Sequence, residues 1–284
     1  MRNKFPTVIL SSLFVLTLVS GLLFGITKPV QASYFDNDGV IEAGEVIDDD
    51  VFMSGNNVVM DGTINGFLMA SGQTITINGT VNGDVFLAGS KIFITESAKI
   101  TGNLFFGCQN AELKGVVEGS VAGGSTSMLA GGDASIGRNL YYGGYSLELQ
   151  PGIKTGRDLY AGVYQAILGG EISRNAKLGA GAVELTGDVG GDMTVDFGTT
   201  DSANSQQPPM FFFPGMNIEM PKPIDPGLRV GPDAKIGGKL TYTASNENLA
   251  AVEAKPGGGV VYQTPIPKEV KEGKESVEKP VKVN

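Results

Sequence analysis

The chain has 284 residues, of which 42 are glycine, and it contains no histidine or tryptophan. Its formal net charge of -9 argues against a nucleic-acid partner, because binding to phosphates requires clustered lysine and arginine. The single cysteine, Cys108, excludes an internal disulfide, and without histidine no nucleophile–base pair can be assembled. We therefore expect no catalytic residues, no cofactor and a protein that is not an enzyme.

Residues 1–32 resemble an export signal. Arg2 and Lys4 precede an apolar run over residues 5–27, and Val30-Gln31-Ala32 before Ser33 has the pattern of a cleavage site. The apolar run is also long enough to span a bilayer, so an uncleaved membrane anchor is the alternative. In both cases we expect an exported protein that is extracellular, at the cell surface or periplasmic.

Residues 33–46 are expected to form an N-terminal cap. Within them Asp36, Asp38 and Glu45 match part of a calcium-binding loop and are the metal-site candidates of the chain. Tyr34 stands where such a loop requires its first carboxylate ligand. We therefore favour a polar cap without a metal ion.

A repeat of 17 or 19 residues begins at residue 47. Apolar residues occupy the first position of each repeat, called X here, and positions X+4, X+11 and X+13. The eight starting residues are Ile47, Ile64, Val81, Ile100, Val117, Ile136, Thr155 and Ile172. Four positions in each of eight repeats make 32, and only Thr155 among them is polar.

Glycine recurs at the positions between these apolar residues. One column is X+2 and another is at or near X+8, and a third lies before each new X. Glycine accepts the backbone angles of a bend, so three bends and three short strands are expected in each repeat. The pattern predicts an all-β fold, a single-stranded right-handed β-helix (β-solenoid) of about ten coils over residues 47–264.

Two segments depart from the repeat. Residues 199–227 form an inserted loop, after which the pattern resumes at Leu228, and residues 265–284 alternate lysine and glutamate and are expected to be disordered. The insertion contains Phe211, Phe212 and Phe213, a group that solvated loops seldom carry, so these are candidates for contact with a partner or a membrane. The alternative is that the loop folds back over one face of the coils.

Three arginines occupy position X+2, where most other coils have glycine. Arg138, Arg157 and Arg174 belong to successive coils, so their side chains should stand about 5 Å apart in a row. Such a row needs neutralisation, either by a bound polyanion such as an envelope polymer or by the neighbouring carboxylates Asp133, Asp158 and Glu171. We list the three arginines as candidates for anion binding.

Polar residues also form a column at X+3. Its members are Asp84, Asn103, Ser120, Asn139, Asp158, Asn175 and Asp192. Asp84 and Asp158 are about 19 Å apart by coil spacing, too far to act together on a glycosidic bond. We expect a ladder of hydrogen bonds between coils, and we expect Cys108, at X+8, to be a small corner residue.

Three stretches resemble bactofilins, the polymer-forming cytoskeletal proteins. They are ITINGTVNGDVFLAGSKIFI at 75–94, ESAKITGNLFF at 96–106 and VGPDAKIGGKLTY at 230–242. The resemblance implies a right-handed β-helix that assembles end to end into filaments without a nucleotide. Most bactofilins are cytoplasmic, so the export signal, together with the phenylalanine-rich insertion, makes this chain similar to exported bactofilin-like proteins.

The expected function is a non-enzymatic structural scaffold of the cell envelope that self-associates. One alternative is a monomeric extracellular module that binds a polyanionic envelope polymer or a protein partner. A third is a β-helix enzyme acting on polysaccharides.

Overall fold

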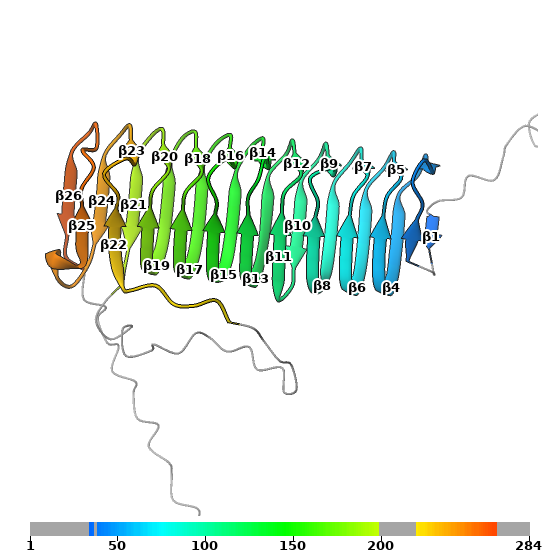
Figure 1. Ribbon diagram of the computed structural model, residues 1–284, viewed down its shortest axis with the longest axis horizontal. Coiled ribbons are helices and arrows are strands. Elements are labelled where there is room, and N and C mark those ends of the chain that lie inside the picture. Colours follow the sequence, from blue (N-terminus) through cyan, green and yellow to red (C-terminus); the bar gives the residue numbers. More distant parts are fainter. Residues whose placement is uncertain (1–33, 37–38, 199–219, 266–284) are drawn as a thin grey trace, which may run out of the picture.

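The structure, a computed structural model, describes residues 34–36, 39–198 and 220–265. These residues form one rod of stacked coils, a β-solenoid of about 11 turns (Figure 1). One short 3-10 turn, η1 (Glu247–Leu249), is the single helical element of the described chain. The expected all-β solenoid is therefore confirmed.

Most coils contain one long and one short strand. The ten-residue strands are β4 (Val51–Met60), β6 (Leu68–Ile77), β8 (Val85–Ile94), β13 (Val121–Ala130), β15 (Leu140–Leu149), β17 (Leu159–Leu168) and β19 (Ala176–Leu185). The two-residue strands are β3 (Val46–Ile47), β5 (Thr63–Ile64), β7 (Thr80–Val81), β9 (Lys99–Ile100), β12 (Val116–Val117), β14 (Ser135–Ile136), β16 (Lys154–Thr155), β18 (Glu171–Ile172), β20 (Asp188–Val189) and β23 (Lys235–Ile236).

The remaining strands belong to coils that are partial or interrupted. They are β1 (Tyr34–Asp36), β2 (Val40–Ile41), β10 (Leu104–Gly107), β11 (Asn110–Leu113), β21 (Met193–Asp196), β22 (Gly227–Val230), β24 (Leu240–Thr243), β25 (Ala250–Val252) and β26 (Val260–Gln263).

Every strand pairs in parallel with the equivalent strand of a neighbouring coil. Leu68 of β6, for example, lies opposite Val51 of β4 and Val85 of β8, so one X+4 column continues through three coils. The long strands join into a 16-stranded sheet and the short ones into a 10-stranded sheet. The in-register stacking places equivalent residues of successive repeats in rows along the rod.

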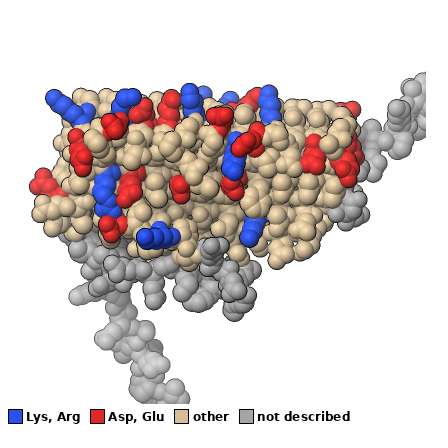
Figure 2. Space-filling view, in the orientation of Figure 1, with Lys and Arg blue, Asp and Glu red and all other residues tan. Residues whose placement is uncertain are grey.

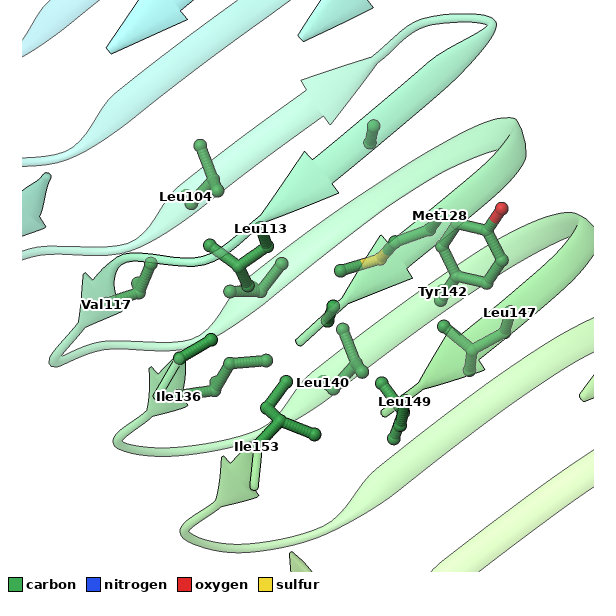
Figure 3. Close-up of a cluster of buried hydrophobic side chains, with 14 of the residues drawn as sticks. Leu104, Leu113, Val117, Met128, Ile136, Leu140, Tyr142, Leu147, Leu149 and Ile153 are labelled. Carbon is green, nitrogen blue, oxygen red and sulfur yellow. The ribbon is translucent and has the colours of Figure 1, made fainter. Parts of the chain in front are cut away.

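The core is a column of apolar side chains inside the rod. All four columns taken from the sequence point inward, and Figure 3 shows Leu104, Leu113, Val117, Ile136 and their neighbours filling the interior from successive coils. Position X+6 is a fifth inward column that the repeat analysis missed. Its buried members are Met53, Ala70, Leu87, Phe106, Tyr142, Ala161, Leu178, Val195 and Tyr242.

The structure differs from the expected repeat in two places. The bend near X+8 does not interrupt pairing, because strands such as β4 and β6 run through it in register, so two strands and not three form most coils. The segment assigned to an N-terminal cap also contributes strands, since β1 and β2 both pair with β4. It therefore forms a partial coil stacked on the first full one.

Candidate functional site

The arginine row is in register, as its spacing predicts. The backbone N–H of Arg157 donates to the carbonyl oxygen of Arg138 at 3.0 Å, and that of Arg174 donates to Arg157 at 3.1 Å. All three residues are exposed. The corner between the short and long strands therefore carries three cationic side chains in consecutive coils.

The row is only partly neutralised by the protein. Arg174 contacts the carboxylate of Asp158 at 3.8 Å, whereas Glu171 pairs with Lys154 at 3.8 Å. Neither Arg138 nor Arg157 has an ion pair within 4.0 Å among the described residues. Two adjacent cations therefore remain available to an external anion.

Glycine fills the same X+2 column in the neighbouring coils for a steric reason. A Cβ on Gly83, Gly102 or Gly119 would collide with the carbonyl oxygen of the coil before it. Arginine thus occupies three consecutive coils of a column that otherwise favours the smallest residue.

Charged side chains elsewhere on the corner are paired across coils. Lys99 contacts Glu118 at 2.9 Å, and Lys235 contacts Asp188 at 3.4 Å. Figure 2 shows charges of both signs interspersed along the edge that carries the short strands. These exposed pairs contribute little to stability.

The X+3 column forms the hydrogen-bond ladder that its composition predicts. Asp84 accepts from the backbone N–H of Asn103 at 2.7 Å, and Asn103 accepts from that of Ser120 at 2.9 Å. The ladder continues to Asp192, which accepts from the backbone N–H of Lys239 at 2.7 Å. These polar side chains therefore join the coils to one another.

Cys108 lies at the bend between β10 and β11, where it is partly buried against the core. Burial raises the pKa of its thiol to about 12, against a smaller lowering by a hydrogen bond with Ser125. The adjacent Tyr142 hydroxyl is 2.9 Å from the Ser125 hydroxyl and donates to the carbonyl oxygens of Ser125 and Ser146. Burial also raises the pKa of Tyr142. A thiol with so high a pKa is protonated at neutral pH and is a poor nucleophile.

The described end of the insertion lies against the solenoid. The side-chain amide of Gln165 donates to the carbonyl oxygen of Lys222 at 3.1 Å and accepts from the backbone N–H of Ile224 at 3.0 Å. Figure 1 shows this segment running along the lower edge of the coils before β22. Phe211, Phe212 and Phe213 lie outside the described residues.

The metal candidates are not brought together by the described chain. Glu45 accepts a hydrogen bond from the backbone N–H of Glu42 at 3.2 Å, Asp36 lies in β1, and Asp38 is outside the described residues. No group of three or more potential metal ligands occurs within the described ranges.

An exposed row at X+5 escaped the repeat analysis. We define the aromatic ridge as the large apolar side chains of this row, Phe52, Met69, Phe86, Phe105, Tyr141 and Tyr160, which alternate with the inward X+4 and X+6 residues. Ala122 occupies the row between Phe105 and Tyr141 and leaves a gap in the ridge. The rings of Phe86 and Phe105 stack at 5.0 Å, and those of Tyr141 and Tyr160 stack at 5.2 Å. Met69, Phe105, Tyr141 and Tyr160 are each about 40% exposed: 44%, 38%, 43% and 42%.

The two ends of the rod finish in strands with one partner each. Within the described chain, β1 pairs only with β4 and β26 pairs only with β24. Val260 of β26 lies opposite Leu240 and continues its inward column, yet it is 46% exposed because no further coil covers it in the described residues. Among the described residues, the outer edge of the strand at each end of the rod is therefore unpaired.

Comparisons with protein families, with curated proteins and with solved structures found no match to this chain. Among the described residues, no helix is long and apolar enough to cross a membrane.

Proposed function

We propose that the protein is a non-enzymatic structural scaffold of the cell envelope whose rods associate end to end. The observation that carries the proposal is the open strand edge at each end, β1 at one and β26 at the other. An unpaired parallel edge recruits a further strand when its shape and register match. Because every coil repeats the same parallel pairing, a second copy stacked on either end continues the sheets and buries the exposed end of the core.

The sequence supports the location. The signal pattern at residues 1–32 favours export, with the protein either released or held by an uncleaved anchor. The resemblance to bactofilins favours self-association without a nucleotide.

Negative-stain electron microscopy of the purified chain over a range of concentrations tests the proposal. We expect end-to-end filaments, and we expect Val260→Asp to shorten them to particles one rod long because stacking would bury the new carboxylate in the core. Val261→Asp is the matched control, since Val261 follows Val260 in the same strand and lies opposite the outward Thr241. Particles that are one rod long at all concentrations would overturn the proposal.

A second candidate function, binding of a polyanionic envelope polymer, is favoured by Arg138 and Arg157, which form no ion pair with the residues that the structure describes. Titration with polyphosphate at increasing salt should show binding that weakens with ionic strength. Arg157→Ala should reduce the affinity at least fivefold. Arg229→Ala is the control, because Arg229 is already engaged by Glu184 at 3.1 Å and Asp225 at 3.8 Å. Equal losses in both variants would refute a specific site.

A further inference from the structure

The face that carries the aromatic ridge has a second row beside it. Position X+7 lies two residues after the ridge position X+5. In eight consecutive coils the residue at X+7 is small, and we call this row of small residues the trough. Its members are Ser54, Ser71, Ala88, Gly107, Gly124, Gly143, Gly162 and Gly179. The two rows point to the same side of the sheet and are about 7 Å apart.

Four of the five glycines of the trough are not required by the rod itself, the exception being Gly124, whose Cβ would lie 3.2 Å from the carbonyl oxygen of Gly143. A Cβ added to Gly107, Gly143, Gly162 or Gly179 would meet no atom within 4 Å. None of the four has a positive φ, so the backbone does not demand glycine either. This contrasts with the corner glycines, where a Cβ would collide with the preceding coil. The missing side chains leave open space above the sheet.

The face is also free of charge over most of its length. The first seven coils place no charged residue in the ridge or the trough, although the chain as a whole has a net charge of -9. Toward the C-terminal end the rows bound a groove of about 730 Å³ whose lining includes Tyr141, Gly143 and Tyr160 and also the charged residues Lys177 and Asp196. A second copy can therefore contact the ridge and the trough of the first seven coils without burying a charged side chain.

We propose that two copies pair side by side, in parallel, with the ridge of each copy in the trough of the other. A two-fold axis running along the rod between the two rows brings each ridge residue opposite the trough residue of the same coil in the partner copy. Phe86 then faces Ala88, Phe105 faces Gly107 and Tyr141 faces Gly143. Each bulky side chain meets a small one, as in the interdigitated interfaces of stacked sheets.

The area is sufficient for a specific contact. Eight coils at about 4.8 Å by five residues at about 3.3 Å give about 600 Å² for each copy, or about 1,200 Å² in total. This is the lower limit for a stable interface, so pairing is expected to depend on concentration.

Other occupants fit the face less well. Sugar rings stack on the flat faces of aromatic side chains, but in Tyr141 and Tyr160 these faces are stacked on each other with an interplanar angle of 8°. A membrane with anionic lipids would repel a chain with a net charge of -9.

Small-angle X-ray scattering of the full chain separates this pairing from end-to-end association. Side-by-side pairing doubles the mass per unit length of the scattering particle, whereas end-to-end association leaves it unchanged. We expect the doubling to appear as concentration rises, both in the wild type and in Val260→Asp.

Two variants should disrupt side-by-side pairing in different ways. Phe86→Lys places a charge in the ridge, and Gly143→Val fills the trough at a site with room for a side chain. Each should raise the dissociation constant of the pair at least tenfold. Phe93→Lys is the matched control, because Phe93 is an outward, half-buried phenylalanine in the same strand, β8, on the other side of its bend. Circular dichroism checks that each variant remains folded.

Three outcomes would overturn the proposal. The mass per unit length could stay at that of one rod at every concentration. Phe93→Lys could weaken pairing as much as Phe86→Lys does. Phe86→Lys could leave pairing unchanged and instead abolish co-sedimentation with phosphatidylcholine vesicles, which would assign the face to a membrane.

Discussion

The Oδ1 atom of Asp158 accepts two hydrogen bonds from Asn175 in the next coil. The backbone N–H of Asn175 donates at 3.1 Å and its side-chain amide donates at 2.9 Å. Asp158 is only 7% exposed, so these hydrogen bonds between neighbouring coils are largely shielded from solvent. The same relationship recurs along the X+3 column, for example between Asp84 and Asn103, so side-chain hydrogen bonds join successive coils of a chain that has a single cysteine.

Asp158→Ala should therefore lower the free energy of unfolding by about 1–3 kcal/mol, because it leaves a partly buried N–H of Asn175 without its acceptor. Asp158→Asn keeps a side-chain oxygen and should lose less. Chemical denaturation measures the difference. Asp133→Ala, an exposed aspartate in a corner of the preceding coil, is the control and should change stability by less than about 0.5 kcal/mol. Equal effects of the two alanine variants would contradict the ladder.

Glycines of the two kinds should respond differently to alanine. Gly83→Ala should destabilise the rod by about 1–3 kcal/mol, since the new Cβ would collide with the carbonyl oxygen of Gly66 and the coils would have to separate. Gly162→Ala has no atom within 4 Å of the new Cβ and should be neutral or stabilise by about 0.4–1 kcal/mol. Thermal unfolding of the two variants checks this, and a similar loss in both would refute the steric distinction.

The repeat made the solenoid predictable because four inward columns carry almost uninterrupted apolar residues. The same argument predicted the arginine row and the X+3 ladder, since in-register stacking turns a sequence column into a spatial row.

The X+6 column and the aromatic ridge were missed for one physical reason. In Val85-Phe86-Leu87 the inward and outward positions are both apolar, so the alternation that marks a half-buried strand is absent. Gly123 further breaks the X+6 column, and it does so because the ring of Phe106 occupies the space that its Cβ would need. Which residue type fits at such a position depends on how one coil packs on the next, and the sequence of a single repeat does not contain this information.

Gln165 should hold the described end of the insertion against the coils. Gln165→Ala removes both hydrogen bonds to the segment at Lys222 and Ile224, so hydrogen exchange of residues 220–226 should become at least tenfold faster while the core strands stay protected. Thr74→Ala is the control, because Thr74 is the equivalent X+10 residue in an earlier coil and is only half-buried. Unchanged exchange in Gln165→Ala would show that other contacts hold the segment.

The partly buried Cys108 thiol predicts a loss of stability in alkali. Its pKa rises from 9.0 to about 12 on folding, because the folded protein favours the protonated thiol. The contribution of this thiol to the free energy of unfolding is therefore fully present below pH 9 and is lost as the pH rises from about 9 to about 12. The slope contributed by this one group approaches about 1.4 kcal/mol per pH unit. Urea denaturation between pH 8 and 11 should show a smaller decline in Cys108→Ser than in the wild type. Parallel declines would contradict the assignment.

Replacing the hydroxyl group of Thr155 with a methyl group should stabilise the protein. It is the one polar residue among the inward X positions, it is fully buried, and its Oγ1 has no hydrogen-bond partner within the described structure. The residues above and below it in the column are Ile136 and Ile172. Thr155→Val keeps the branched shape and removes the unsatisfied group, so the free energy of unfolding should rise by about 1 kcal/mol. Thr80→Val, at a half-buried outward position of β7, should change it by less than about 0.5 kcal/mol. A loss of stability in Thr155→Val would mean that the hydroxyl has a partner inside the rod, such as an ordered water, and that the polar residue contributes to holding the coils together.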